Sequence, residues 1–536
     1  MRIKLLAVLT VCAAALAFAA QASASRYIVI LKHGKTDAGL EAVVKAGGKV
    51  VHVNRVVGIA TVAASKGFAA KLRATGRVDG VALNAAWNQP EPRLKPASVV
   101  FNRRFYDAQA RTPLPVPAPD AEAGCGAQFS NPTPGPEPLS VCQWDMRQIN
   151  ATTAGSYAVD QGEGTRIGDI DTGADVNHPD IAPNLNLAES CSFIAPGTPT
   201  SRSEEWESDQ VNCPTKSAVQ DYNGHGTHTA STILAPINGI GIAGVAPKAQ
   251  LIVLHAGTAN GGYFFTDSVV NALIYAGDHH LDAVNMSFFA DPYLYNCHGQ
   301  QDQQAIIKAI SRAAQYANQK GVVLVAAAGN EASDLDHPPD QDVSSPDYPP
   351  GAETPRDINN NCVVVPTELP WVLTVSATGP RKLLAFYSNI SNSKVDVTAP
   401  GGSSNQAPNP YGRVLAAWST TAPVVSTTAR REVEDCETVG GAPVCALYGW
   451  IQGTSMAAPH ATGVVALIRS HHPSMSPMAV QAMVQNTAQP MACPTAAESA
   501  AFAIADRRCT GGGSQGNGQT SFYGNGLVDA LAASLR

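Results

Sequence analysis

Short apolar runs and longer amphipathic segments alternate along most of the chain after residue 165. The short runs are rich in branched side chains, which is typical of buried strands, and the longer segments have the period of helices. This alternation predicts an α/β fold with a mostly parallel, doubly wound sheet that helices cover on both faces. We expect strands at 166–171, 250–255, 283–287 and 321–327, and helices at 226–234, 266–276, 301–317 and 454–470.

A smaller unit precedes this body. Residues 27–83 have the order β-α-β-β-α-β, which predicts a ferredoxin-like α+β domain and implies no activity of its own. Residues 112–138 contain eight prolines and no periodic pattern, which is typical of an extended linker. We therefore place the small domain at 25–95, a Pro-rich linker and processing region at 96–138, and the main domain at 139–536.

The first 24 residues have the features of a secretory signal peptide. Arg2 and Lys4 precede an apolar run at 5–20, and Ala22-Ser23-Ala24 supplies the small residues of a cleavage site. The run is short for a membrane span, although an uncleaved anchor is the alternative interpretation. No other stretch of the sequence is long and apolar enough to cross a bilayer, so we expect a secreted protein without membrane contact after cleavage.

The net charge of -7 conceals two oppositely charged parts. Residues 1–111 carry 17 Lys/Arg and 5 Asp/Glu, whereas residues 112–536 carry 19 and 38, so their net charges are +12 and -19. An acidic body repels phosphate backbones, which argues against nucleic acid as a partner. The basic N-terminal part and the acidic body attract each other, which matters if the first part is detached from the second.

The cysteines predict an oxidised protein. Eleven are present, and ten remain after Cys12 is removed with the signal peptide. An even number in an exported chain indicates disulfides, and no two cysteines have the spacing of a zinc site, the alternative. Ten cysteines permit hundreds of connectivities. Proximity in the sequence favours Cys125–Cys142, Cys191–Cys213, Cys297–Cys362, Cys436–Cys445 and Cys493–Cys509.

Three residues together have the chemistry of a serine nucleophile that an imidazole and a carboxylate activate. Asp171 ends a predicted strand, and His225 and Ser455 lie at predicted helix starts among small residues. A serine hydroxyl attacks well only when an imidazole takes its proton, and the imidazole needs a carboxylate to fix its tautomer. Each residue alone has an ordinary interpretation, as a turn Asp, a metal-binding His-x-x-His pair or an N-cap Ser. The combination in this order is much more specific.

These motifs resemble those of the subtilisin-like serine proteases, the subtilases of peptidase family S8. The resemblance covers roughly 140–536 and rests on Asp171-Thr172-Gly173, His225-Gly226-Thr227-His228, Ala326-Ala327-Ala328-Gly329-Asn330 and the segment 453–460, which reads Gly-Thr-Ser-Met-Ala-Ala-Pro-His. It implies a subtilisin-like parallel sheet, and it implies that Asp171, His225 and Ser455 are the catalytic residues. It also implies that Asn330 donates to the oxyanion, a role that an amide N–H suits physically, whereas an isolated Gly-Asn is often only a turn.

The resemblance implies a substrate strand beside Ser287, Ala327 and Gly329. The family usually has Leu-Gly-Gly after the serine, whereas this chain has Phe288-Phe289-Ala290. We therefore expect strand addition to persist and the side-chain pockets to be reshaped.

The N-terminal domain also resembles a family feature, the inhibitory propeptide, over residues 26–93. The resemblance implies an intramolecular inhibitor and folding aid that is cleaved off between about residue 90 and Cys125. The alternative is an accessory domain that stays attached.

Calcium is a further implication of the family resemblance. Asp180 and Asn238 occupy positions where relatives hold structural Ca²⁺, with carbonyls of the 236–242 loop as companions; the alternative is a solvated loop. The acidic residues at 331–342 have three interpretations, a second calcium loop, a rim for basic substrates or a solvated insertion.

The sequence thus predicts a secreted, autoprocessed serine endopeptidase that is monomeric, acts on proteins and peptides, and has no organic cofactor. Two alternatives remain, a dedicated processing protease or transpeptidase on the same scaffold, and a non-catalytic binding protein that keeps the fold.

Overall fold

The computed structural model describes residues 25–84, 136–195, 206–213, 215–259, 261–343, 355–408, 410–422, 432–439, 442–511 and 518–536. The predicted signal peptide at 1–24, most of the predicted linker and Cys125 lie outside the described residues. The chain divides into two compact units, and the first boundary along the chain falls at Ala85.

The N-terminal unit is a four-stranded antiparallel sheet with two helices, and the order β2-β3-β1-β4 confirms the predicted ferredoxin-like topology. Its core contains Val29, Leu31, Val43, Phe68 and Leu72. The second helix begins at Phe68, directly after the N-cap Gly67, whose φ is 90°. The elements are β1 (Ser25–Leu31), α2 (Thr36–Lys45), β2 (Lys49–Asn54), β3 (Ile59–Ala64), α3 (Phe68–Ala74) and β4 (Val78–Leu83).

The main unit is built on an eight-stranded sheet of order β16-β15-β11-β9-β5-β8-β6-β7. Seven strands run parallel, and the edge strand β7 is antiparallel to β6, which confirms the predicted parallel α/β fold. The strands are β5 (Arg166–Asp171), β6 (Cys191–Ala195), β7 (Trp206–Asn212), β8 (Gln250–His255), β9 (Ala283–Met286), β11 (Val323–Ala327), β15 (Val372–Thr378) and β16 (Val397–Pro400).

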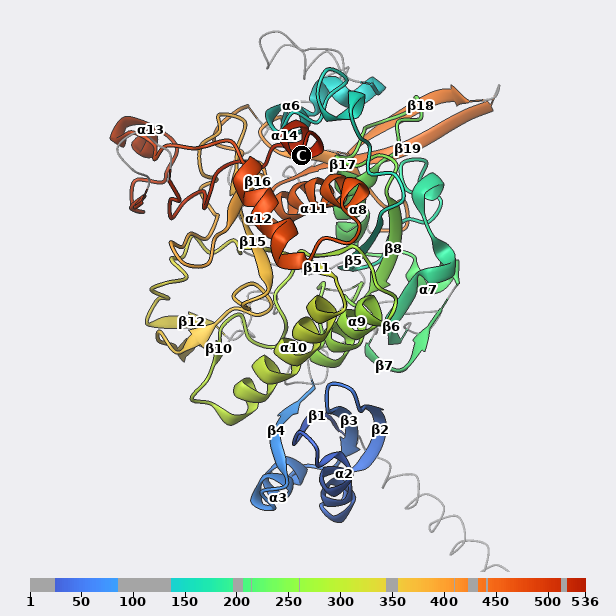
Figure 1. The fold of residues 1–536 in the computed structure, drawn as a ribbon, viewed down its shortest axis with the longest axis vertical. Coiled ribbons are helices and arrows are strands. Elements are labelled where there is room, and N and C mark those ends of the chain that lie inside the picture. Colours follow the sequence, from blue (N-terminus) through green and yellow to red (C-terminus); the bar gives the residue numbers. More distant parts are fainter. Residues whose placement is uncertain are drawn as a thin grey trace, which may run out of the picture. The chain divides into compact units, whose positions relative to one another are not determined.

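The helices of the main unit form two groups (Figure 1). Helices α8 (His225–Leu234), α11 (Thr454–His471) and α12 (Pro477–Thr487) gather in one group, and α9 (Thr266–Asp278) lies in another with the part of α10 (Gln301–Gln319) that follows Ala309. Residues 299–309 are grouped with the N-terminal unit. Helix α11 is buried from Thr454 to Arg469, as expected of a helix at the centre of a large core. The remaining helices are η1 (Pro138–Cys142), α6 (Trp144–Gln148), η2 (Ser156–Ala158), η3 (Ala182–Asn184), η4 (Leu187–Glu189), α7 (Lys216–Val219), α13 (Ala496–Ala501) and α14 (Ala530–Ser534).

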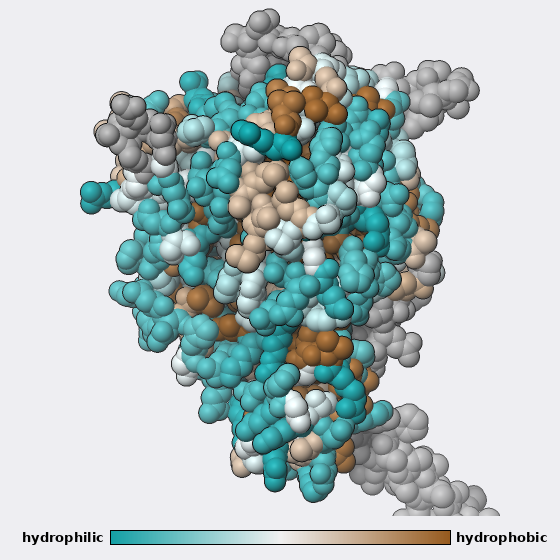
Figure 2. All heavy atoms as spheres, viewed as in Figure 1, coloured by the Kyte–Doolittle hydropathy of each residue, from teal (hydrophilic) through white to brown (hydrophobic). Residues whose placement is uncertain are grey.

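The described part of the main unit also contains three smaller sheets. One contains β17 (Val414–Ala417), β19 (Ala442–Ile451) and β18 (Glu432–Val439), and two pairs contain β10 (Asn296–Cys297) with β14 (Cys362–Val363) and β12 (Gln341–Val343) with β13 (Pro355–Asp357). The surface seen in Figure 2 is mostly hydrophilic, with scattered hydrophobic patches. In the described part of the chain, no helix has the length and apolar character that crossing a membrane requires.

Within the described residues, disulfides join the predicted pairs Cys191–Cys213, Cys297–Cys362 and Cys493–Cys509. Cys142 is also disulfide-bonded, while its predicted partner Cys125 lies outside the described residues. The β18–β19 register sets Cys436 opposite Cys445.

Candidate active site

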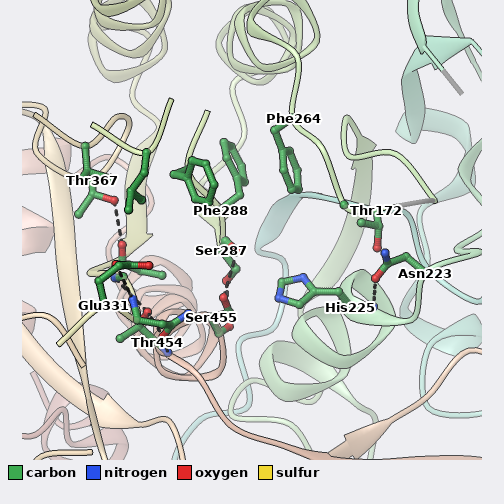
Figure 3. Close-up of a pocket in the computed structure, with 18 residues that line it drawn as sticks. Thr172, Asn223, His225, Phe264, Ser287, Phe288, Glu331, Thr367, Thr454 and Ser455 are labelled. Carbon is green, nitrogen blue, oxygen red and sulfur yellow. Dashed lines mark hydrogen bonds between the residues drawn. The ribbon is translucent and has the colours of Figure 1, made fainter. Parts of the chain in front are cut away.

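The carboxyl ends of β5, β9 and β11 and the first turns of α8 and α11 meet at one cleft (Figure 3). Parallel α/β sheets place ligand sites at this edge, because the loops that leave the strands converge there. Of the residues predicted from the sequence, His225, Ser287, Ala327, Gly329, Asn330 and Ser455 all line the cleft. The other lining residues are Thr172, Asn223, Gly261, Gly262, Phe264, Phe288, Phe289, Leu294, Glu331, Val364, Thr367 and Thr454.

Asp171 and His225 form a direct pair. Nδ1 of His225 lies 2.8 Å from Oδ1 and 2.9 Å from Oδ2 of Asp171, and Asp171 is fully buried. Gly226 permits this approach, because a Cβ there would lie 2.1 Å from the carbonyl oxygen of Gly173 and 3.2 Å from Cβ of Asp171. Helix α8 can therefore begin directly against the end of β5.

The charges around the imidazole favour its protonated form. Burial by itself would lower the pKa of His225, but the carboxylate of Asp171, with a smaller contribution from Asp221, raises it above the ordinary value. Asp221 is buried and accepts hydrogen bonds from Asn223, Gly224, Thr227 and Thr172. Its carboxylate therefore fixes the turn before α8 while it adds negative charge to the site.

Ser455 lies in the first turn of α11 and is 7% exposed. Its Oγ donates to the carbonyl oxygen of Ser287 at 3.2 Å, and Oγ of Ser287 donates to the carbonyl oxygen of Ser455 at 2.9 Å. This reciprocal pair joins the end of β9 to the start of α11. In Figure 3 the imidazole of His225 points across the cleft toward Ser455.

The side-chain amide of Asn330 is held by its oxygen. Oδ1 accepts from the backbone N–H of Thr454 at 2.9 Å and from its hydroxyl at 3.0 Å. The hydroxyl of Thr454 also accepts from the backbone N–H of Gly329 at 3.0 Å. With the oxygen fixed on Thr454, the Nδ2 end is the part of this amide that can donate to a ligand beside Ser455.

One wall of the cleft is formed by the rings of Phe264 and Phe288, of which only Phe288 was singled out from the sequence. Phe288 is the residue that departs from the family pattern, and its ring stacks on Phe264 with centroids 4.1 Å apart and 10° between the planes (Figure 3). Asp291 holds Phe264 in place, because its Oδ2 accepts from the Phe264 N–H at 2.8 Å and its own N–H donates to the Phe264 carbonyl at 3.1 Å. Phe264 lies outside any motif, so only the fold reveals it.

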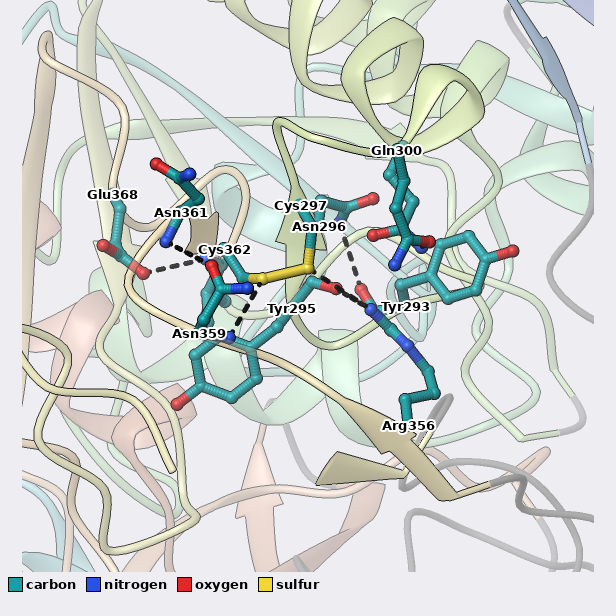
Figure 4. Close-up of a disulfide and its surroundings, with 12 residues drawn as sticks. Tyr293, Tyr295, Asn296, Cys297, Gln300, Arg356, Asn359, Asn361, Cys362 and Glu368 are labelled. Atoms are coloured by element: carbon teal, nitrogen blue, oxygen red, sulfur yellow. Dashed lines mark hydrogen bonds between the residues drawn. A yellow bond between two sulfur atoms is a disulfide. The ribbon is translucent and has the colours of Figure 1, made fainter. Parts of the chain in front are cut away.

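A disulfide supports another part of this region (Figure 4). Cys297 and Cys362 are opposite one another in the β10–β14 pair and are disulfide-bonded. They belong to a hydrophobic cluster with Leu294 and Val364, both of which line the cleft. Nη2 of Arg356 donates to the carbonyl oxygen of Tyr295 at 2.9 Å in the same cluster. The disulfide therefore stiffens residues that a substrate side chain would contact.

The groups around Asp180 do not fit a calcium ion held between Asp180 and Asn238. Oδ2 of Asp180 accepts from the Tyr448 hydroxyl at 2.8 Å and from the Ile242 N–H at 3.2 Å, and Oδ1 faces Nδ2 of Asn238 at 3.4 Å. Oδ1 of Asn238 is itself used by the Ile240 N–H at 3.1 Å. A hard cation requires surrounding oxygen ligands, whereas Tyr448, Ile242 and Asn238 all present donors to this carboxylate.

The acidic segment at 331–342 is held by ordinary hydrogen bonds. Glu331 accepts from the backbone N–H of Asn330 at 2.9 Å and from Asn389 at 2.8 Å, and Asp336 accepts from Asn392 and Ser393. Within the described residues, no group of three or more His, Cys, Asp or Glu side chains is arranged to hold a metal ion. Calcium at this segment stays a prediction, because backbone and amide carbonyl oxygens are also calcium ligands.

The fold and the cleft define a parallel α/β protein with a candidate serine-nucleophile site at the carboxyl edge of its sheet. A family model described as the subtilase family matches residues 162–526, and the chain therefore belongs to the subtilase family. It is a subtilisin-like serine endopeptidase.

Relatives of this chain include subtilisins and one protease that is intracellular by its name. Subtilisin BL of Lederbergia lenta is 26% identical over 73% of this chain and 98% of its own. The major intracellular serine protease of Bacillus subtilis is 26% identical over 58% of this chain and 70% of its own. The crystal structure of the epidermin leader peptide processing serine protease of Staphylococcus aureus matches 95% of this chain and 97% of its own, with 20% identity and a TM-score of 0.62. That last likeness supports the fold alone.

Proposed function

We propose that this chain is an exported, autoprocessed endopeptidase in which Ser455, His225, Asp171 and Asn330 perform the chemistry. The contact of His225 Nδ1 with both oxygens of Asp171, in the cleft that holds Ser455, is the observation that carries this proposal. The cleft thus holds the two elements that acyl transfer needs, a nucleophile and an oriented base.

In the proposed reaction, Oγ of Ser455 attacks the scissile carbonyl carbon while Nε2 of His225 takes the hydroxyl proton. Asp171 keeps the proton of His225 on Nδ1 and stabilises the imidazolium that forms. The former carbonyl oxygen becomes negatively charged, and Nδ2 of Asn330 and the backbone N–H of Ser455 donate to it. His225 then gives its proton to the leaving amine, and water releases the acyl group by the same steps in reverse.

The substrate is a protein or peptide bound as an extended strand. Ser287 follows β9, and Ala327 and Gly329 lie at the end of β11, so a peptide can add its backbone hydrogen bonds beside them. The stacked Phe264 and Phe288 supply an apolar surface to one side. This surface favours apolar side chains over charged ones at the substrate position that contacts it.

The N-terminal unit is proposed to be the propeptide. Residues 25–83 form an independent α+β sheet, and the charges of +12 and -19 for the two parts of the chain favour docking before cleavage. Export follows from the signal-like residues 1–24 and agrees with disulfides, which form in oxidising compartments. We propose a monomer without organic cofactor, and no step of the reaction uses calcium.

Replacing Ser455 tests the proposal directly. Ser455→Ala should accumulate as an unprocessed precursor without hydrolysis of casein, while the control Ser499→Ala should mature normally, because Ser499 lies on α13 and does not line the cleft. Mass and N-terminal sequence of the secreted product give the processing site. Hydrolysis by Ser455→Ala at the wild-type rate would refute the mechanism, and one or two cuts in a peptide panel would identify a dedicated processing enzyme instead.

A further inference from the structure

A second buried carboxyl group, which the proposed reaction does not use, lies beside the candidate triad. Asp169 is two residues before Asp171 on β5, so both side chains point to the same face of the sheet. Asp169 is 2% exposed. A buried carboxyl group next to a second one costs free energy unless its polar atoms are satisfied, so its partners indicate why this position is acidic.

Asp169 is hydrogen-bonded on both oxygens. Oδ1 accepts from Nδ2 of Asn285 on β9 at 2.9 Å, and Oδ2 lies 2.8 Å from Oγ1 of Thr229 on α8. These two neutral partners belong to the two elements that position the nucleophile and the base. On the neighbouring parallel strand β8, Val253 is the residue that pairs with Asp169.

Each partner continues toward a proposed catalytic residue. Oγ1 of Thr229 lies 3.1 Å from the carbonyl oxygen of Gly226 and 3.4 Å from that of His225. Nδ2 of Asn285 also lies 3.1 Å from Oγ of Ser287, which donates to the carbonyl oxygen of Ser455 at 2.9 Å. One carboxyl group thus connects the first turn of the base helix with the backbone of the nucleophile.

Burial beside the Asp171 carboxylate favours a neutral Asp169, whereas the hydrogen bonds from Thr229 and Asn285 by themselves favour the ionised form. Thr229 has a single hydroxyl proton and lies within reach of Asp169 and of the carbonyl oxygens of His225 and Gly226. If Asp169 carries a proton, it donates to Thr229, and the Thr229 hydroxyl donates onward to a carbonyl oxygen. The titratable groups that interact with Asp169 are Asp171 on its own strand and His225 on α8. Burial first, and then the charge of Asp171, raise the pKa of Asp169 to about 8.

We propose that Asp169 is a positioning residue that, in its protonated form, holds the His225 turn and the Ser455 backbone in register through Thr229 and through Asn285 and Ser287. The proposal rests on the proposed roles of His225 and Ser455. It explains why an acid occupies a buried position beside the triad carboxylate, where a second negative charge is unfavourable.

Two variants at position 169 separate a neutral hydrogen-bonding role from a charged one. Asp169→Asn has the shape and donor of the protonated acid, so its kcat at pH 7 should stay within about threefold of wild type. Asp169→Ala removes both connections, and kcat should fall about tenfold or more with little change in KM. Asp282→Asn is the matched control, because Asp282 is a carboxylate at the opposite end of the same sheet that accepts from the Arg166 N–H.

The pH profile supplies a readout that folding alone does not change. Wild-type kcat should fall with a midpoint near pH 8 as Asp169 ionises, and this step should be absent from Asp169→Asn. The same step in Asp169→Asn, equal losses in the Asn and Ala variants, or wild-type kcat in Asp169→Ala would each overturn the proposal. If Asp169→Ala does not fold, the profile of Asp169→Asn decides.

The full chain should be expressed and the mature form counted by its reaction with phenylmethylsulfonyl fluoride. Measuring Ser455→Ala alongside the variants at position 169 separates a failure of the proposed function from a failure of the proposed role of Asp169. Activity in that variant defeats the proposed function, whereas an inactive Ser455→Ala together with any of the overturning results above defeats only the role of Asp169.

Discussion

The hydroxyl of Tyr448 lies 2.8 Å from Oδ2 of Asp180, and both residues are buried. A neutral donor from β19 therefore satisfies a carboxylate at the place where the family resemblance implies calcium. Burial raises the pKa of Asp180 well above its ordinary value, and the hydrogen bond from Tyr448 opposes this effect. In this chain, a side-chain hydroxyl therefore hydrogen-bonds the carboxyl group at this point of the fold.

We expect Tyr448→Phe to lower the free energy of unfolding by about 1–3 kcal/mol, because a buried acceptor loses its donor. EDTA should leave the melting temperature of the wild-type protein unchanged. Tyr411→Phe is the matched control, since Tyr411 packs in the same hydrophobic cluster. Differential scanning calorimetry measures both effects. A large loss on EDTA treatment, with a silent Tyr448→Phe, would contradict this interpretation.

The rise of activity with pH should follow His225. The imidazole acts as a base only when neutral, so kcat/KM should increase as pH rises through its pKa. Because Asp171 raises that pKa above 6.5, the half-maximum of the acidic limb should lie above pH 6.5. In Asp171→Asn, kcat should fall by about 10⁴, as in other triads in which the carboxylate is replaced. A limb that stays below pH 6.5 would contradict the charge arrangement around His225.

Asn330→Leu should lower kcat and leave KM nearly unchanged, because the oxyanion forms only during the reaction. The loss measured for such a donor in a subtilisin is about 10² to 10³ in kcat, and we adopt this magnitude rather than derive it. Asn361→Ala, an exposed asparagine, is the control. Steady-state kinetics on a peptide anilide distinguishes the two parameters. An increase in KM alone would assign Asn330 to ground-state binding.

Removing the Cys297–Cys362 disulfide should affect both stability and binding. Its sequence separation of 65 predicts a loss of about 4 kcal/mol in the double Ser variant, and its cluster supplies Leu294 and Val364 to the cleft, so KM should rise. The control is the pair Cys493–Cys509, with a separation of 16 and an expected loss of about 3 kcal/mol. Its removal should leave KM unchanged. Equal KM values in both variants would show that the first disulfide does not shape the cleft.

Glu368 should make the protein less stable at alkaline than at mildly acidic pH. Burial raises the pKa of Glu368 to about 7, whereas about 4.3 is usual for an unfolded chain. A raised folded pKa stabilises fully below the unfolded value, and this stabilisation is lost as pH rises through 7. Glu368→Gln keeps an acceptor for the Val364 N–H and does not titrate. Between pH 5 and 8 it should therefore gain about 1–3 kcal/mol relative to wild type in urea unfolding.

The sequence predicted most of the sheet and helices because their periodicity is strong. The structure has β5 and β8 at the predicted residues, and α8 and α9 begin within one residue of prediction. Ser287 was expected to end a strand and instead follows β9, where its hydroxyl bonds to the carbonyl oxygen of Ser455. Boundaries of this kind depend on tertiary hydrogen bonds, which periodicity does not contain.

The residues of the candidate site also divide into those that motifs predict and those that only the fold reveals. Residues inside motifs, such as Asp171 and Ser455, were found because their local context is specific. Phe264 and Asp169 were missed, because one lies in a loop and the other looks like any strand residue until Asn285 and Thr229 are placed beside it. The pattern of one acid two residues before another on a strand was a usable signal for Asp169.

Under the proposed catalytic roles of His225 and Ser455, the order of the strands also determines when a newly made chain can cut peptides. Helix α11 packs against β9, β11, β15 and β16, so Ser455 is placed only after almost all of the sheet has been synthesised. At about 5–20 residues per second, Ser455 leaves the ribosome roughly 10–50 s after His225. A nascent polypeptide of this topology therefore has no complete peptidase centre while its own unpaired strands are exposed, and translation order delays self-digestion until folding can protect the product.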